Sequence, residues 1–498
     1  MILRRNAMKV ELKCREKSEY KLLCSSQSSS QLSEEIIVSD TMEDIQRILC
    51  CRQQCRIREK DVRQDAASIS GELDATVLYV PESGEGIRFI SSTFPFEVTF
   101  DTAGADSTTV SVSRITGISI DARASNPRKV AINAVINMEQ SCYKYADMSW
   151  TEAPDTVPEK MFFKTASAQY KSITLAGEKS LSLEDELQLP ESVDGGEFVK
   201  AFTTASVEGS EIVGSKLVVK GRMDIEALYI VSDTLQPVHF YLAFSQLFTL
   251  PDEPSATEVS ATAMVTGQYF ESFENKLSAD IRAVVQVVCV QERSIDYVSD
   301  AYSCRKALEL NKSDLEIING TAYEKRSVSV LLTYSSDYGI SSVSCSHTVL
   351  SKPELSDDEG KVLVPVYVDV IYTDADGALR SCRARGRAEA ELSGGFEHIY
   401  AACTDCSVSF DGNTVSASVS ICLESSTVSK SKLSVISEVD ELEKELARNG
   451  AAAYMCRWND SDLWDAAKKF GSDVELIKRV NGLETSEPDG RLLLIPVI

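Results

Sequence analysis

Positive charge is scarce in this chain of 498 residues. Lys and Arg number 51 against 76 Asp and Glu, a formal net charge of −25. This balance argues against a sequence-independent nucleic-acid binder, which needs a positive surface to release counterions. No apolar run reaches the roughly 18 residues of a membrane span, and no apolar segment of a secretory signal follows the first residues. We therefore expect a soluble, cytoplasmic protein without integral membrane contact.

Histidines and catalytic motifs are also rare. The three histidines, His239, His347 and His398, lie in strand-like segments. The chain lacks the Gly-x-Ser-x-Gly, His-Glu-x-x-His and Gly-x-Gly-x-x-Gly patterns of hydrolases, metalloproteases and dinucleotide-binding enzymes. We predict a non-enzymatic protein without catalytic residues and without a cofactor.

The 14 cysteines are too few and too scattered for a disulfide framework, which indicates reduced thiols in a reducing compartment. Two groups contain residue types that bind metals: Cys50, Cys51 and Cys55, and the pair Cys403 and Cys406 with Cys382 and His398 upstream. Neither group offers four ligands with a second close pair, as a structural zinc site requires. We predict no metal site.

Alternation of apolar and polar residues dominates positions 34–425. Every second residue is apolar within 361–372, and apolar residues alternate with serines within 414–422. Such period-two patterns predict half-buried antiparallel strands. The best helical pattern in this region covers residues 42–50. We expect a mainly β protein built from antiparallel β-sandwich-like domains.

The β region contains an internal repeat. Residues 71–79 (GELDATVLY) align with residues 221–229 (GRMDIEALY), and residues 368–372 (VDVIY) form a shorter third copy. We call these nine-residue segments and the third copy the repeat motif. Because the copies are more than a hundred residues apart, they indicate three whole domains rather than short solenoid units.

One position differs between the copies. Phe94 and Phe244 each follow the motif tyrosine by fifteen residues, whereas the third copy has Arg387 there. We therefore expect this strand face to be apolar in two copies and basic in the third.

These patterns divide the chain into three tandem β domains and a small C-terminal unit. Prolines mark a boundary near 147–160, and polar residues followed by an acidic–basic pattern predict a linker with a short helix over 435–447. The expected division is an N-terminal segment 1–33, β domains 34–146, 161–290 and 300–424, a linker 425–450 and a C-terminal unit 451–498.

The C-terminal unit has a β-α-α-β pattern. Its two strands and two helices are expected at residues 452–458, 463–470, 472–482 and 492–496. Gly471 ends the first helix, and Ser472 with Glu475 three residues later is the pattern of a capping box.

This unit resembles a LysM domain in the residues DLWDAAKKFGSDVELIKRVNGL and DGRLLLIP. LysM domains bind N-acetylglucosamine-containing glycans between the loop before the first helix and the loop after the second. The resemblance implies a groove at Asp460, Ser461, Asp462, Leu463, Asn481, Gly482 and Leu483, and a core with Trp464, Phe470, Ile477 and Ile495. Residues 460–462 replace the usual Gly-Asp-Thr, which restricts the backbone and adds charge where a sugar would approach.

The β region also resembles a known domain. The segments EEIIVSDTMEDIQRILCC, GELDATVLYV and NPRKVAI are similar to the SPOCS domain of clostridial spore proteins. Three such domains followed by one LysM domain is the layout of the SipL-type family of spore coat morphogenetic proteins. That family's chains begin near MKVEL, so Met8 is an alternative start to Met1.

The resemblance implies a scaffold for spore coat assembly in the mother-cell cytoplasm, at the forespore surface. There the LysM domain is understood to dock the coat ATPase that polymerises on that surface. A second hypothesis stays open, in which the LysM domain binds peptidoglycan in a cell-wall protein. The missing export signal favours the protein partner.

Overall fold

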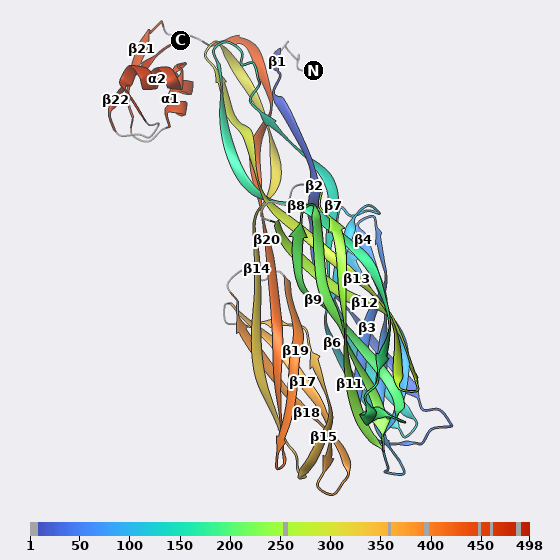
Figure 1. Cartoon of the computed structure of the whole chain (residues 1–498). Coiled ribbons are helices and arrows are strands. Elements are labelled where there is room, and N and C mark those ends of the chain that lie inside the picture. The colour runs from blue at the N-terminus through green and yellow to red at the C-terminus, as the bar shows by residue number, and fades with distance from the viewer. Residues whose placement is uncertain are drawn as a thin grey trace.

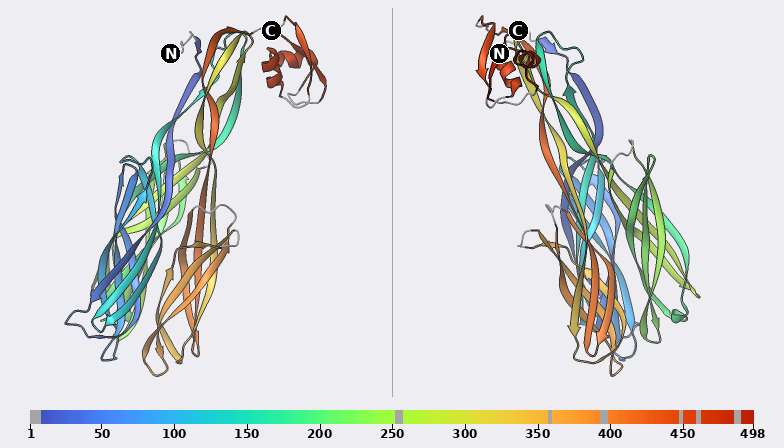
Figure 2. Two further views of the ribbon diagram at one scale, coloured as in Figure 1. Left: turned by 180° about the vertical axis from the view of Figure 1, so that it is seen from behind. Right: turned by 60° about the vertical axis from the view of Figure 1, so that its left-hand side comes forward.

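The computed structural model describes residues 8–251, 257–356, 360–392, 398–446, 450–458, 462–484 and 490–498. The protein is mainly β, with three elongated β bodies beside one another and a narrow stalk that projects beyond them (Figure 1). A small C-terminal unit, which contains α1 and α2, lies beside the end of the stalk in all views (Figures 1 and 2). Within the residues so described, no helix has the length and apolarity needed to cross a membrane.

Three long antiparallel ribbons run from the bodies into the stalk. Their strands are β2 (Lys13–Ile37) with β7 (Lys129–Glu152), β8 (Met161–Gln188) with β13 (Lys276–Ser303), and β14 (Lys306–Ser335) with β20 (Thr414–Glu445). Single residue pairs join neighbouring ribbons, Tyr20 with Ile173 and Ile318 with Lys171. The stalk is therefore a bundle of three ribbons rather than a continuous sheet.

Further strands widen each ribbon. They are β1 (Met8–Val10) on β20, β6 (Val110–Asn126) on β7, β12 (Thr257–Phe273) on β13, and β19 (His398–Asp411) on β20. Separate antiparallel sheets face the ribbons inside the bodies. These are β3 (Ile45–Arg63), β4 (Ala66–Pro81) and β5 (Arg88–Asp101); β9 (Glu197–Val213), β10 (Lys216–Val231) and β11 (Thr234–Thr249); and β15 (Ile340–Leu350), β16 (Glu354–Leu355), β17 (Lys361–Asp374) and β18 (Leu379–Glu391). A short 3-10 helix, η1 (Glu191–Val193), precedes β9.

Each body has an apolar core between its separate sheet and its widened ribbon. On β17 the alternate residues from Val362 to Tyr372 are buried, and on β20 Val415 and Ile421 point into the same core. The period-two prediction for these segments is confirmed, because one face of each strand is covered by the opposite sheet.

The three repeat motifs meet where the bodies touch. Leu78, Leu228 and Ile371, which each precede the motif tyrosine, belong to one buried cluster shared by the three separate sheets. The tyrosines themselves point into their own bodies, as Tyr79 and Tyr229 do. The motif thus contributes alternately to the core of a body and to the junction between bodies.

The motif glycine allows a close approach of two other groups. Gly71 lies opposite Phe96, and Gly221 lies opposite Phe244, in the paired strands. A Cβ atom on either glycine would collide with the phenylalanine ring and with a backbone carbonyl of the strand on the other side. Glycine is therefore required for packing here rather than for a turn.

This register corrects the expected pairing of the copies. The residue equivalent to Phe244 is Phe96, not Phe94, because the hairpin after the first motif is two residues longer. In the third copy Val364 lies opposite Ala388. Valine thus replaces the glycine, and the smaller alanine replaces the phenylalanine. Arg387 is exposed on the other face of the strand, so the prediction that the face equivalent to Phe94 and Phe244 becomes basic is wrong.

Two predicted helices are strands. Residues 42–50 enter β3, and residues 435–447 include the last part of β20, which extends to Glu445. Pairing with β4 and β14 overrides the local periodicity. The expected N-terminal segment and linker likewise contain most of β2 and the stalk half of β20.

Candidate functional site

The C-terminal unit has the expected order β21 (Ala453–Arg457), α1 (Leu463–Phe470), α2 (Val474–Asn481) and β22 (Leu492–Pro496), with β21 antiparallel to β22. Gly471 and Gly482 end the helices with positive φ of 66° and 63°, as their sequence positions predict. The capping prediction for α2 is wrong: Asp473, not Ser472, caps the helix through the backbone N–H of Glu475.

This unit packs against the end of the stalk. Tyr302 and Cys304, where β13 ends, share an apolar cluster with the core of the unit. The Tyr302 ring meets the Trp464 ring edge to face at 4.8 Å, and its hydroxyl donates to the Ser472 carbonyl at 2.8 Å. The carbonyl of Ser472 is thus used to bind the stalk.

Polar contacts strengthen the same interface. Asp300 on β13 accepts hydrogen bonds from Trp464 Nε1 at 2.8 Å and from Lys468 Nζ at 2.7 Å. Lys164 on β8 pairs with Asp462 at 2.6 Å. Burial alone would raise the pKa of Asp300, but the hydrogen bonds from Lys468 and Trp464 outweigh it and lower the pKa below the ordinary value.

The first predicted groove loop is only partly described. Asp460 and Ser461 lie outside the described residues. Asp462 caps α1 and pairs with Lys164, and Leu463 is fully buried, so the structure places Leu463 in the core rather than on a groove.

The second predicted groove loop is held from inside the unit. The Asn481 amide donates to the carbonyls of Ile477 and Leu494 and accepts from the N–H of Leu494, at 2.7–2.8 Å. Gly482 is exposed, and Leu483 is half-buried against the core. The structure therefore gives Asn481 a clamping role that the sequence pattern did not indicate.

The residues assigned to the core fall into two groups. Ile477 and Ile495 are buried. Trp464 and Phe470 are half-buried; Phe470 packs on Tyr454 with ring centroids 5.0 Å apart, whereas Trp464 faces the stalk.

An apolar surface lies away from the stalk contacts. Met455 on β21 is 63% exposed and lies opposite Leu494 on β22, while Leu492, 55% exposed, lies opposite Arg457. We call these four residues the outer face of the C-terminal unit. Since Leu493 and Ile495 point into the core, the run LLLIP already carries the alternation that exposes Leu492 and Leu494.

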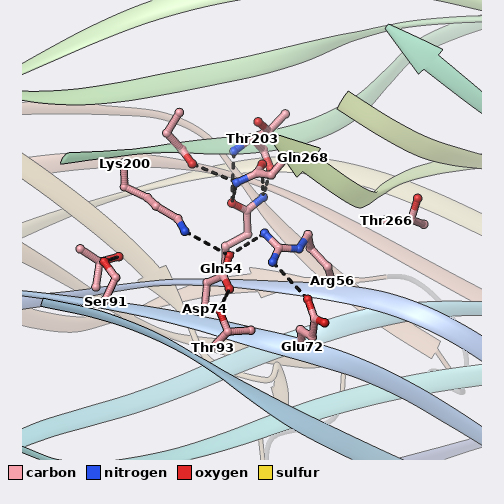
Figure 3. A network of polar contacts seen from close by, with 12 residues as sticks. Gln54, Arg56, Glu72, Asp74, Ser91, Thr93, Lys200, Thr203, Thr266 and Gln268 are labelled. Carbon is pink, nitrogen blue, oxygen red and sulfur yellow. Dashed lines mark hydrogen bonds and ion pairs between the residues drawn. The ribbon is translucent and has the colours of Figure 1, made fainter. Parts of the chain in front are cut away.

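A second candidate site is a polar network between the first and second bodies (Figure 3). Gln54 on β3 and Gln268 on β12 exchange hydrogen bonds through their amides, at 2.9 and 3.2 Å. Asp74, the buried aspartate of the first motif, pairs with Arg56 at 2.5 Å and accepts from Thr93 at 2.6 Å. Lys200 of the second body is 3.7 Å from Asp74.

This network connects the two bodies, and its positive side chains lie beside its negative ones. Its acid and bases bind one another, so they are suited to fixing an orientation rather than to proton transfer. The sequence identified Asp74 as a repeated residue but gave no sign of its partner Lys200 in β9 or of the contact between Gln54 and Gln268 in β12.

Arg52 occupies the junction of the three bodies. Only 2% of it is exposed, and it forms an ion pair with Glu226 of the second body. Its guanidinium lies 4.8 Å from the centroid of the Phe202 ring and 3.6 Å from the Cys345 sulfur. Burial, together with Arg52 and Arg383, holds the pKa of His347 well below its usual value, so this histidine is neutral.

A polar cavity of about 220 Å³ lies where the stalk meets the bodies, and Glu19 lines it. Glu19 accepts from the hydroxyls of Ser172 at 2.5 Å and Tyr170 at 3.3 Å. Burial raises the pKa of Glu19 despite these hydrogen bonds.

The two cysteine groups do not form a metal site in the described part of the chain. Cys50 and Cys51 are buried on β3, and Nδ1 of His398 lies 2.8 Å from a carboxylate oxygen of Glu139. Among the described residues, no three His, Cys, Asp or Glu side chains are placed to hold a metal ion.

The structure thus defines a mainly β protein in which long ribbons carry three bodies and a small β-α-α-β unit. Residues 44–123, from the start of β3 into β6, match the family model described as SipL, SPOCS domain. This match indicates a sporulation-related protein. No curated protein matches the chain.

Proposed function

We propose that this chain is a non-enzymatic scaffold of spore coat assembly, and that its C-terminal unit is a LysM domain that docks a coat ATPase at the forespore surface in the mother cell. On this proposal the three bodies are three SPOCS-type β-sandwich domains. The SPOCS match in the first body and the motif shared by all three support this assignment.

The observation that carries the proposal is the position of the C-terminal unit. The three ribbons end at the pairs of Lys13 with Glu152, Met161 with Ser303 and Lys306 with Glu445, and these ends form the far end of the stalk (Figure 1). The unit packs at this end, away from the three bodies (Figure 1). Such an arrangement presents a binding unit at a distance from the bodies, as an adaptor between two layers needs.

We further propose that the ATPase contacts the outer face of the C-terminal unit. The helix face that includes Trp464 is covered by the stalk, and Asn481 is held internally. Met455, Leu492 and Leu494 remain exposed beside Arg457, an apolar surface with a positive rim. Exposed apolar residues grouped in this way are typical of protein–protein contacts.

The test is binding of the full chain to the purified coat ATPase and, in parallel, to purified peptidoglycan. Met455→Glu with Leu492→Glu is expected to weaken ATPase binding at least tenfold. Leu331→Glu, which alters an equally exposed leucine on β14, is the matched control and is expected to bind normally.

Retention on peptidoglycan without ATPase binding would refute the scaffold proposal and favour the cell-wall hypothesis. Normal ATPase binding by the double variant would be consistent with the scaffold proposal but would refute the proposal that the ATPase contacts the outer face.

A further inference from the structure

Two cysteines face each other across the first ribbon. Cys24 on β2 and Cys142 on β7 are register partners, and each thiol perturbs the pKa of the other. Directly opposed residues of an antiparallel pair have Cα atoms about 4.5–5.5 Å apart. This separation lies within the range of about 4.4–6.8 Å that a disulfide spans.

No other cysteine has such a partner in the strand registers of the described residues. Cys289, which is equally buried, lies between Leu175 and Val259. Cys50 and Cys345 lie opposite Leu78 and Ile371. The arrangement of Cys24 and Cys142 is therefore specific to this place in the fold.

We propose that Cys24 and Cys142 are a thiol pair that forms a disulfide when the folded chain meets an oxidant of the small-molecule disulfide class. Cys24 is partly exposed, whereas Cys142 is fully buried. This difference assigns the order of the reaction: Cys24 attacks the reagent, and Cys142 resolves the intermediate.

The two steps balance as thiol–disulfide exchange. The Cys24 thiolate attacks one sulfur of the reagent, which breaks the reagent's S–S bond and releases one thiolate. The Cys142 thiol then loses its proton and attacks the Cys24 sulfur, which expels the second thiolate. Two protein thiols are oxidised, and one reagent disulfide is reduced to two thiols.

The surroundings make this reaction selective and slow at neutral pH. Burial raises the pKa of both thiols, that of Cys142 to about 12. Lys430 on β20 opposes this effect at Cys24, because its ammonium donates to the nearby Leu22 carbonyl at 2.8 Å and favours the thiolate. The rate is thus expected to rise with pH.

The disulfide would join β2, the edge strand of the first ribbon, covalently to β7. β2 pairs along its length with β7 but meets β8 at a single residue pair, Tyr20 with Ile173. A bulge at Leu22 also interrupts the ladder beside Cys24. A covalent bond at this point would prevent β2 from separating from β7.

The experiment oxidises the folded full-length chain with oxidised glutathione at mildly alkaline pH, alkylates the remaining thiols and maps the peptides without reduction. The expected product joins the Cys24 and Cys142 peptides and is cleaved by dithiothreitol. Cys142→Ser is expected to trap glutathione on Cys24, whereas Cys24→Ser should leave Cys142 unmodified. Cys289→Ser is the matched control and should form the same disulfide as the unchanged chain.

The unchanged chain decides the result even if a serine variant fails to fold. Recovery of Cys24 and Cys142 as separate alkylated peptides, under conditions that oxidise exposed thiols such as Cys14, would overturn the proposal. Joining of either cysteine to a different partner in the folded chain would also overturn it.

Discussion

Gly71→Ala tests whether the repeat motif requires glycine because neighbouring groups leave no space for a Cβ atom. The added Cβ would meet the Phe96 ring and the carbonyl oxygen of Arg56. The ring can shift, but the carbonyl belongs to β3, so the strand itself must move. Overpacking of this kind costs about 1–3 kcal/mol, and a clash with backbone favours the upper half of that range.

Gly177→Ala is the matched control. Gly177 is also in a strand interior, on β8, and a Cβ there would meet nothing within 4 Å. Because alanine has less freedom than glycine in the unfolded chain, this change is expected to be neutral or to stabilise by about 0.4–1 kcal/mol. The two variants should therefore differ by about 2 kcal/mol or more.

Local hydrogen exchange is the suitable assay. The tryptophans, Trp150, Trp458 and Trp464, lie in the stalk and the C-terminal unit, so their fluorescence would not report on the first body. Amide protons of β4 are expected to exchange about 30-fold faster in Gly71→Ala, the equivalent of about 2 kcal/mol. Equal exchange of β4 in both variants would refute the packing explanation.

Three further outcomes follow from the charged groups. Glu226→Ala is expected to destabilise the junction by about 3–5 kcal/mol in urea titrations, because buried Arg52 loses its partner, whereas Glu226→Gln should cost less. Asp300→Asn should speed amide hydrogen exchange in α1 several-fold. Because the folded pKa of Asp300 is lowered, acidification of the unchanged chain below about pH 4 should loosen the contact between α1 and the stalk in the same way. Glu19→Gln should stabilise the chain at neutral pH but not in acid, because the raised pKa of Glu19 makes its charged form unfavourable in the fold.

The strands of the bodies could be predicted from the sequence because their burial alternates locally. The alternation over residues 361–372 predicts a strand, and these residues lie in β17, which extends to Asp374. The stalk could not be predicted in this way. A ribbon in a bundle of three buries few residues, and on β20 these include Val435, Ile436 and Val439, whose spacing imitates a helix. The polar residues before them, within 425–434, are therefore typical of a linker in the sequence although they lie in β20.

The candidate site was predictable to a similar degree. The order and ends of α1 and α2 follow from local signals such as Gly471. The contacts of Asp300 with Trp464 and of Lys164 with Asp462 join residues far apart in the chain, and no periodicity marks them. The resemblance placed a groove on a face that the stalk partly covers.

The junction of the bodies explains why the three copies differ where they meet. In each copy, the motif residue three positions before the tyrosine has one partner on the neighbouring strand. Thr76 lies opposite Arg52, Glu226 opposite Phe202, and Asp369 opposite His347. Three arginines at such a junction would repel one another in a poorly solvated space. Here Arg52 stacks on Phe202 and pairs with Glu226, and His347 stays neutral beside it. Three identical chains would have to place the same residue at all three positions. A single chain with three diverged copies can place one charge, one ring and one neutral imidazole there. The three bodies can therefore pack against one another only because their copies differ at this position.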